Sequence, residues 1–188
     1  MTAEEVHFAC AEAALRGWST PGNKTAQEWY EGGVRLSFNE WGITDATVID
    51  AYLNDATSQP IDYVDPKDDK NNYFTRMKDI AIKWDESAGL EKKLERIMMQ
   101  KWIGAFVNTN EMWSDFRRTG YPKLYYNPLN HSVEAYGVIG KEEFNMRELF
   151  VEAERLNNTE GIKETEKKMS GPDKISTRLW IHPDKPNF

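Results

Sequence analysis

The chain has 188 residues, of which 24 are Lys or Arg and 31 are Asp or Glu, so its formal net charge is −7. This acidic balance disfavours nucleic-acid binding, because a phosphate backbone attracts basic surfaces. Hydrophobic residues make up 39% of the chain and include seven Trp, eight Phe and eight Tyr, which is enough apolar surface to form the core of one domain and excludes general disorder.

A first helix is predicted directly after Thr2. Thr2 and Glu5 have the spacing of a capping box, and apolar residues follow at helical period. Gly17 is placed where a glycine ends a helix.

A second helix follows a short loop, because Thr25 and Glu28 repeat the capping arrangement. Its apolar stripe includes Trp29 and Trp41, for which core packing is favoured over ligand binding. Gly42 ends this helix.

Small residues recur where the two helices cross, at Ala9, Ala13 and Gly33. Such residues let two backbones approach while larger rings fill the neighbouring gaps. The sequence therefore predicts an antiparallel helical hairpin over residues 2–42, of the kind found in tetratricopeptide proteins.

A third short helix, capped by Thr44, is predicted to run to Leu53. Residues 54–86 are dense in Pro, Asp and Asn and are expected to form a loop-rich segment. Tyr63 and Tyr73 lie in this segment.

A second hairpin is predicted over residues 87–118. Its first helix, from about Ser87 to Val107, carries Trp102 on an apolar stripe, and a shorter helix carries Trp113. The charged residues of the first helix mostly fall off the stripe and are expected on the solvent side: Glu91, Lys92, Lys93, Glu95 and Arg96.

The region 119–188 is expected to be irregular, with one or two short helices. No segment alternates at period two for long enough to predict a sheet. The chain is therefore interpreted as one all-α domain, built from tetratricopeptide-like helical hairpins with long irregular loops.

Catalytic and metal-binding signatures are absent from the sequence. The three histidines lack the spacing of a metal pair, so no metal ligation is expected, and no phosphate-binding loop or nucleophile elbow occurs, so no cofactor is expected. The single cysteine, Cys10, cannot form an intramolecular disulfide. No stretch approaches the ~18 apolar residues of a membrane span, so the sequence is that of a soluble chain.

The remaining candidates for function are aromatic and basic side chains. Arg117 and Arg118 follow a short helix, where they can bond free carbonyls, pair with carboxylates or hold an anionic partner, and structural pairing is favoured. Tyrosine rings in loops can stack on the apolar face of a sugar. The candidates for a ligand platform are Tyr63, Tyr73, Tyr125 and Tyr126.

Four segments, in this order, resemble the C-terminal part of proteins of the SusD/RagB family. They read TAEEVHFACAEAALRGW, EWYEGGVRLSFNEWG, IMMQKWIGAFVNTNEMWSDFRRTGYPKL and GPDKISTRLW. The resemblance covers nearly the whole chain and is weakest over residues 55–84 and 127–169.

The resemblance implies a non-catalytic, surface-exposed outer-membrane lipoprotein. Family members bind glycans or other nutrients and act as a lid on a TonB-dependent transporter, which their tetratricopeptide helices generally face. Because family members are several times longer than one helical pair and carry a lipid-bearing cysteine, we expect this chain to be part of a longer protein. Cys10, in mid-helix, is unsuited to be the lipid anchor.

Two other functions are compatible with the residues. A tetratricopeptide-like adaptor would bind another protein in a helical groove, but the predicted hairpins do not repeat at about 34 residues. An acidic glycoside hydrolase would need two carboxylates at a fixed separation, and sequence does not measure that separation.

Overall fold

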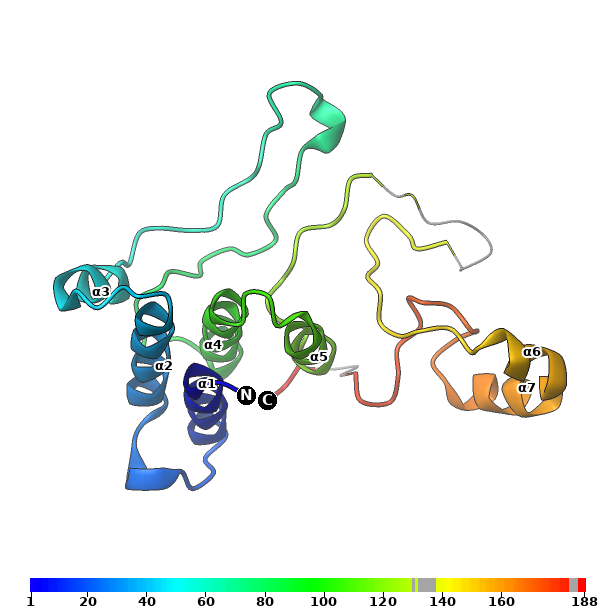
Figure 1. Ribbon diagram of the computed structural model, residues 1–188, viewed down its shortest axis with the longest axis horizontal. Helices are drawn as coiled ribbons and strands as arrows, with labels where there is room; N and C mark the ends of the chain where they lie inside the picture. The colour runs from blue at the N-terminus through cyan, green and yellow to red at the C-terminus, as the bar shows by residue number, and fades with distance from the viewer. Residues whose placement is uncertain (130, 132–137, 183–185) are drawn as a thin grey trace. The chain divides into compact units, whose positions relative to one another are not determined.

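A computed structural model describes residues 1–129, 131, 138–182 and 186–188, which divide into two compact units. Unit 1 comprises Met1–Pro60, Arg76–Leu124 and the last residues of the chain, and unit 2 comprises Ile61–Thr75 and Tyr125–Asp184. The described residues contain helices, irregular segments and one isolated bridge, but no strand (Figure 1). The predicted all-α fold class is confirmed, and one domain for residues 1–188 stays a prediction.

Unit 1 begins with an antiparallel pair, α1 (Ala3–Leu15) and α2 (Ala26–Glu40), joined through a short 3-10 turn (Figure 1). The backbone N–H of Thr2 donates to the Glu5 carboxylate at 2.8 Å. At the start of α2 the backbone N–H of Thr25 donates to Glu28 Oε2 at 2.7 Å, and the Glu28 N–H donates to the Thr25 hydroxyl at 3.2 Å. These reciprocal bonds satisfy amides that a helix start leaves unpaired.

The third helix, α3 (Ala46–Leu53), packs against α2. Its cap is Asp45, whose Oδ1 accepts from the Thr47 N–H at 2.8 Å. The expected cap at Thr44 is therefore wrong by one residue, because the aspartate carboxylate takes the free amide.

The second helical pair consists of α4 (Leu90–Gly104) and α5 (Thr109–Thr119). The helix α4 is shorter than predicted at both ends. Asp85 Oδ1 accepts from the N–H and hydroxyl of Ser87, which holds the residues before α4 in a turn. At the other end Val107 has a positive φ of 74°, which the helix cannot accommodate.

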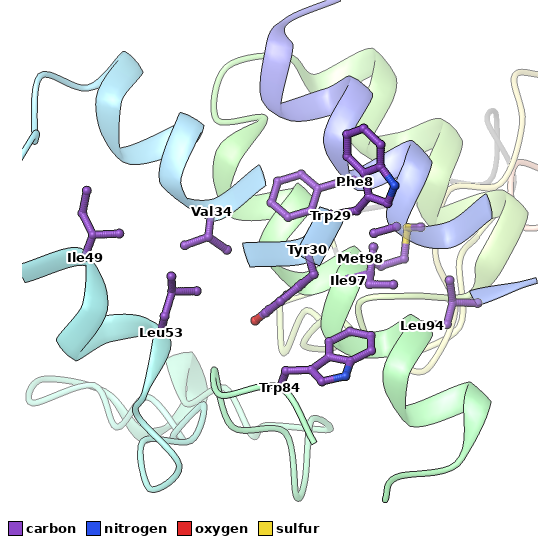
Figure 2. Close-up of a cluster of buried hydrophobic side chains, with 11 residues drawn as sticks. Phe8, Trp29, Tyr30, Val34, Ile49, Leu53, Trp84, Leu94, Ile97 and Met98 are labelled. Carbon is purple, nitrogen blue, oxygen red and sulfur yellow. The ribbon is translucent and has the colours of Figure 1, made fainter. Parts of the chain in front are cut away.

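One hydrophobic cluster holds unit 1 together, and Figure 2 shows its side chains. The contributors come from α1, α2, α3, α4 and the segment before α4. They are Phe8, Ala11, Trp29, Tyr30, Val34, Ile49, Leu53, Trp84, Leu94, Ile97 and Met98. Burial of these side chains is the main favourable contribution to the stability of unit 1.

Several charged residues of α4 are buried, contrary to the expectation that they face solvent. The Glu95 side chain is 1% exposed and accepts from Lys92 Nζ at 3.2 Å. Arg96 is buried as well, and its Nε donates to the Ala81 carbonyl at 3.0 Å. The segment preceding α4 folds over this face of the helix, a tertiary contact that helical periodicity does not report.

Unit 2 contains a one-turn 3-10 helix, η2 (Asp69–Asn71), and two short helices, α6 (Glu152–Asn157) and α7 (Thr159–Lys168), which pack on each other (Figure 1). Asp173 accepts hydrogen bonds from two arginines, Arg147 and Arg155. Burial opposes ionisation of this carboxyl, but the bonds from Arg147 and Arg155 outweigh it and hold the pKa of Asp173 below its ordinary value.

Candidate functional site: a tyrosine surface in unit 2

The segment Ile61–Thr75 consists of two nearly extended stretches joined by a turn. Tyr63 and Tyr73 face each other across these stretches as an antiparallel bridge. The Tyr63 N–H donates to the Tyr73 carbonyl at 2.8 Å, and the Tyr73 N–H donates to the Tyr63 carbonyl at 3.0 Å. This pair of backbone bonds sets the two tyrosines side by side.

The turn between them is held by its own polar side chains. Asp65 Oδ1 accepts from the backbone N–H groups of Lys67 at 2.7 Å and Asp68 at 2.9 Å. The Asp65 N–H donates to Asn72 Oδ1 at 2.8 Å. The bonds from the backbone amides lower the pKa of Asp65. The turn is therefore held by hydrogen bonds within the segment itself, which reduces the ordering cost of binding.

The base of the segment is fixed by two further hydrogen bonds. The Thr75 N–H donates to Asp62 Oδ1 at 2.7 Å. The Tyr125 hydroxyl donates to the Ile61 carbonyl at 2.8 Å. Tyr125, distant in sequence, is thereby brought to the Tyr63–Tyr73 pair.

Three of the four candidate tyrosines form one cluster. The ring centroids of Tyr63 and Tyr73 are 6.1 Å apart at an interplanar angle of 59°, and those of Tyr73 and Tyr125 are 6.5 Å apart at 78°. Tyr63 is 51% exposed, and Tyr73 and Tyr125 are half-buried. We call Tyr63, Tyr73 and Tyr125 the tyrosine surface.

Tyr126 does not belong to this cluster. Its ring stacks on Phe144, with centroids 5.4 Å apart and an interplanar angle of 28°.

The Tyr63 hydroxyl lies 3.3 Å from Asp65 Oδ2. The negative charge of Asp65 raises the pKa of the Tyr63 phenol above its ordinary value. The hydroxyl therefore stays protonated at neutral pH and is a hydrogen-bond donor. An exposed ring with a donor at its edge, next to a carboxylate, can bind both the apolar face and the hydroxyls of a sugar.

The four tryptophans that are expected to be structural differ in how far they are exposed to solvent. Trp29 is buried in the core of unit 1, and Trp102 and Trp113 are half-buried. Trp41 is 57% exposed, so its expected place in the core is wrong. It lies at the end of α2, where its ring pairs with that of the exposed Phe106 at 6.0 Å.

The two arginines at the end of α5 make structural contacts. The Arg117 guanidinium lies over the Trp113 ring, 3.7 Å from its centroid. Arg118 donates to both carboxylate oxygens of Glu12 at 2.7 Å and to Asp115 at 3.1 Å. The bonds to Glu12 raise the pKa of Arg118. This bidentate pair joins α5 to α1.

No metal centre emerges from the part of the chain that the structure describes. Within it, no group of three or more His, Cys, Asp and Glu side chains is arranged to hold a metal ion. Its helices also include none with the length and apolar character needed to cross a membrane.

Comparison with known protein families identifies one whose model matches this chain. The family model described as SusD-like, "Susd and RagB outer membrane lipoprotein", matches residues 1–182. No curated protein matches the chain.

Solved structures of SusD homologues are similar over the whole chain. A chitin-binding SusD homologue from Flavobacterium johnsoniae is 40% identical with a TM-score of 0.83, and the match covers 100% of this chain and 37% of that one. A SusD homologue from Bacteroides uniformis is 40% identical, with a TM-score of 0.79 and coverage of 98% and 37%. A SusD-like protein from Bacteroides thetaiotaomicron is 39% identical, with a TM-score of 0.78 and coverage of 97% and 36%.

This chain spans little more than a third of the length of these structures. The similarity nevertheless extends through both helical pairs and the loops that they carry. The chain belongs to the SusD/RagB family of outer membrane lipoproteins.

Proposed function

We propose that this chain belongs to a glycan- or nutrient-binding protein of the outer-membrane surface, and that the tyrosine surface contacts the ligand. The observation that carries the proposal is the cluster that Tyr125 forms with Tyr63 and Tyr73, whose turn is held by its own hydrogen bonds. The 40% identity to a chitin-binding SusD homologue supports a carbohydrate ligand.

The binding chemistry follows from the side chains present. A pyranose ring presents apolar C–H groups on one face, which pack on an exposed aromatic ring. Its hydroxyls are then within reach of the Tyr63 hydroxyl and the Asp65 carboxylate, which lie at the edge of that ring. Binding of this kind holds the ligand without making or breaking a covalent bond, so no enzymatic activity is proposed.

The partner we propose is a TonB-dependent transporter of the outer membrane, to which the longer protein delivers its ligand as a lid. In this arrangement the helical pairs of unit 1 are the scaffold and the surface that faces the transporter. Family membership supports this proposal. Attachment to the membrane would occur through a lipid anchor, in keeping with the description of the family as outer membrane lipoproteins.

The ligand-binding role is tested by calorimetric titration of the 188-residue chain with N-acetyl-chitooligosaccharides and with neutral glucans. Replacing Tyr63 by Ala is expected to raise the Kd of the bound glycan about tenfold, which corresponds to about 1.4 kcal/mol. Replacing Tyr63 by Phe keeps the ring and is expected to have a smaller effect.

The matched control is Trp41→Ala, which removes an exposed aromatic ring from unit 1. This variant is expected to bind the glycan with the affinity of the unmodified chain. Equal loss of affinity in Tyr63→Ala and Trp41→Ala, or no loss in Tyr63→Ala, would show that the tyrosine surface is not the ligand site.

A further inference from the structure

Trp18 is an exposed aromatic residue of unit 1, whereas the tyrosine surface belongs to unit 2. Its indole is 66% exposed. It follows Gly17, which has a φ of 74° and ends α1. The Gly17 N–H donates to the Ala14 carbonyl at 3.0 Å, and the Trp18 N–H donates to the Ala13 carbonyl at 2.9 Å. This C-terminal cap fixes the backbone of Trp18 at the end of α1.

A hollow of about 770 Å³ lies beside Trp18, between the α1–α2 loop and the start of α4. Its apolar wall includes Trp84 and Leu90. Two ammonium groups line it as well. Lys93 is buried and pairs with Glu86 at 3.0 Å, while Lys24 is exposed, with its Nζ 4.7 Å from the centroid of the Trp29 ring.

Trp18 also lines a second hollow, of about 370 Å³, between α1, α4 and α5. Met98 and the alanines of α1 form its apolar part. Its charged lining consists of Arg16, Lys101, Arg118 and Glu12. Asp115 adds a negative charge next to this hollow, because its Oδ2 pairs with Lys101 Nζ at 2.5 Å.

The two hollows together are basic. Five cations and two carboxylates line them, a balance of three positive charges, and counting Asp115 still leaves two. All of these cations except Lys24 form ion pairs with the three carboxylates, so the positive charge in excess is shared among paired side chains. The chain as a whole has a net charge of −7. A locally positive region on an acidic protein attracts anionic ligands, and hollows concentrate that attraction.

We propose that Trp18 and the two hollows that it lines bind an acidic oligosaccharide. One sugar ring packs on the indole, and carboxylate or sulfate groups on that sugar residue and its neighbours reach the lysine and arginine side chains of the hollows. A pyranose suits the contact with the indole, negative charge suits the cations, and an indole that lines both hollows suits consecutive residues of a sugar chain. This site goes beyond the proposed function and does not involve the tyrosine surface.

The test is titration of the 188-residue chain with three tetrasaccharides: tetragalacturonate, a sulfated heparin tetrasaccharide and neutral N-acetyl-chitotetraose. A shift in tryptophan fluorescence is expected with at least one of the two acidic ligands, and the affinity is expected to fall as salt is added. The two acidic ligands distinguish carboxylate from sulfate recognition. Absence of binding by both would overturn the proposal.

The variants Trp18→Ala and Trp41→Ala form a matched pair, because each removes an exposed indole from unit 1 and only Trp18 lines the hollows. Trp18→Ala is expected to raise the Kd for the acidic ligand about tenfold, and Trp41→Ala is expected to leave it unchanged. Lys24→Gln, at an exposed position, is expected to raise the Kd about twofold and to reduce the salt dependence. Equal affinity of the two tryptophan variants would overturn the proposal.

Two further controls separate ring stacking from attraction by charge alone, and this site from the tyrosine surface. A tetraglutamate peptide carries charge without a sugar ring and is expected to bind more weakly. Binding as tight as that of the acidic sugar would contradict ring stacking.

Tyr63→Ala is expected to leave the affinity for the acidic ligand unaffected, and Trp18→Ala is expected to leave the affinity for the neutral glycan unaffected. Failure of the Trp18 site and failure of the tyrosine surface are therefore distinguishable.

Discussion

Two adjacent glycines of α2 lie against consecutive side chains of α1. A Cβ atom added to Gly33 would lie 2.9–3.0 Å from three ring atoms of Phe8, and one added to Gly32 would lie 2.8 Å from the ring of His7. Phe8 is fully buried, whereas His7 is half-buried. The absence of a side chain at Gly33 is therefore what allows α1 and α2 to approach, since the Phe8 ring has no free space into which to move.

Replacing Gly33 by Ala is expected to lower the free energy of unfolding by about 1–2 kcal/mol, because overpacking against Phe8 exceeds the gain in helix propensity. Replacing Gly32 by Ala is expected to cost less, since the His7 ring can turn toward solvent. Thermal or urea unfolding of the two variants measures the difference. A Gly33 variant as stable as the Gly32 variant would contradict the close packing at Phe8.

The Glu12–Arg118 pair gives unit 1 a dependence on acid pH. Burial raises the pKa of the Glu12 carboxyl, but the hydrogen bonds and charges of Arg118 and Arg16 outweigh it, so the pKa lies below the ordinary value of 4.5. A lowered pKa in the folded state means that this stabilisation is complete above pH 4.5 and is lost as the pH falls through the folded-state pKa.

Glu12→Gln is therefore expected to be less stable than the unmodified chain at neutral pH and to lose less stability on acidification below pH 4.5. Urea unfolding at a series of pH values measures both quantities. Parallel pH profiles for the two proteins would show that Glu12 does not carry this dependence.

The irregular segment before α4, like the helices, contributes contacts that hold unit 1 together. The buried Tyr30 hydroxyl donates to the Ile82 carbonyl at 2.6 Å, and its ring lies 5.3 Å from that of Trp84. The Arg96 side chain bonds the same segment at Ala81. These contacts hold an irregular stretch over α2 and α4 and explain why charged residues of α4 are buried.

Tyr30→Phe is expected to cost about 1–3 kcal/mol, because it leaves the Ile82 carbonyl without its partner while the ring packing is retained. Hydrogen exchange is expected to accelerate at the amides of Ile80 and Lys83, which donate to Gln59 and to the Asp55 carbonyl. An unchanged free energy of unfolding together with unchanged exchange would contradict the role of this hydroxyl.

Helix positions could be predicted from local signals, and the errors have local causes. The capping pairs that start α1 and α2 and the glycines that follow them are encoded within a few residues. The start of α4 could not be placed because the Asp85 side chain captures Ser87 in a turn that the hydrophobic period does not show. Burial of Arg96 could not be predicted because it depends on a segment that covers the helix from outside and that its side chain bonds at Ala81.

The burial of aromatic residues near helix ends is also difficult to predict from the sequence. Trp41 continues the apolar stripe of α2 in sequence. At the end of the helix, however, it lies beyond the core, and its ring pairs with that of the exposed Phe106. A helical stripe therefore predicts the direction of a side chain but not whether another element lies there to cover it.

At the scale of the whole molecule, each of the two units carries an exposed aromatic surface. The tyrosines could be selected as candidates because they lie among loop-forming residues, but their grouping could not be predicted. It depends on the backbone bridge between Tyr63 and Tyr73 and on the hydrogen bond from Tyr125 to Ile61. The stacking of Tyr126 on Phe144 depends on a contact between segments that no local pattern specifies.

The role that we propose is to hold a glycan without altering it. It is tested most directly by a calorimetric titration with N-acetyl-chitohexaose, a fragment of the chitin that the Flavobacterium homologue binds, followed by mass spectrometry of the ligand recovered from the same sample. Saturable binding and recovery of the intact hexasaccharide after prolonged incubation are expected. Shortened products, or no saturable binding to this or any neutral oligosaccharide tested, would contradict it.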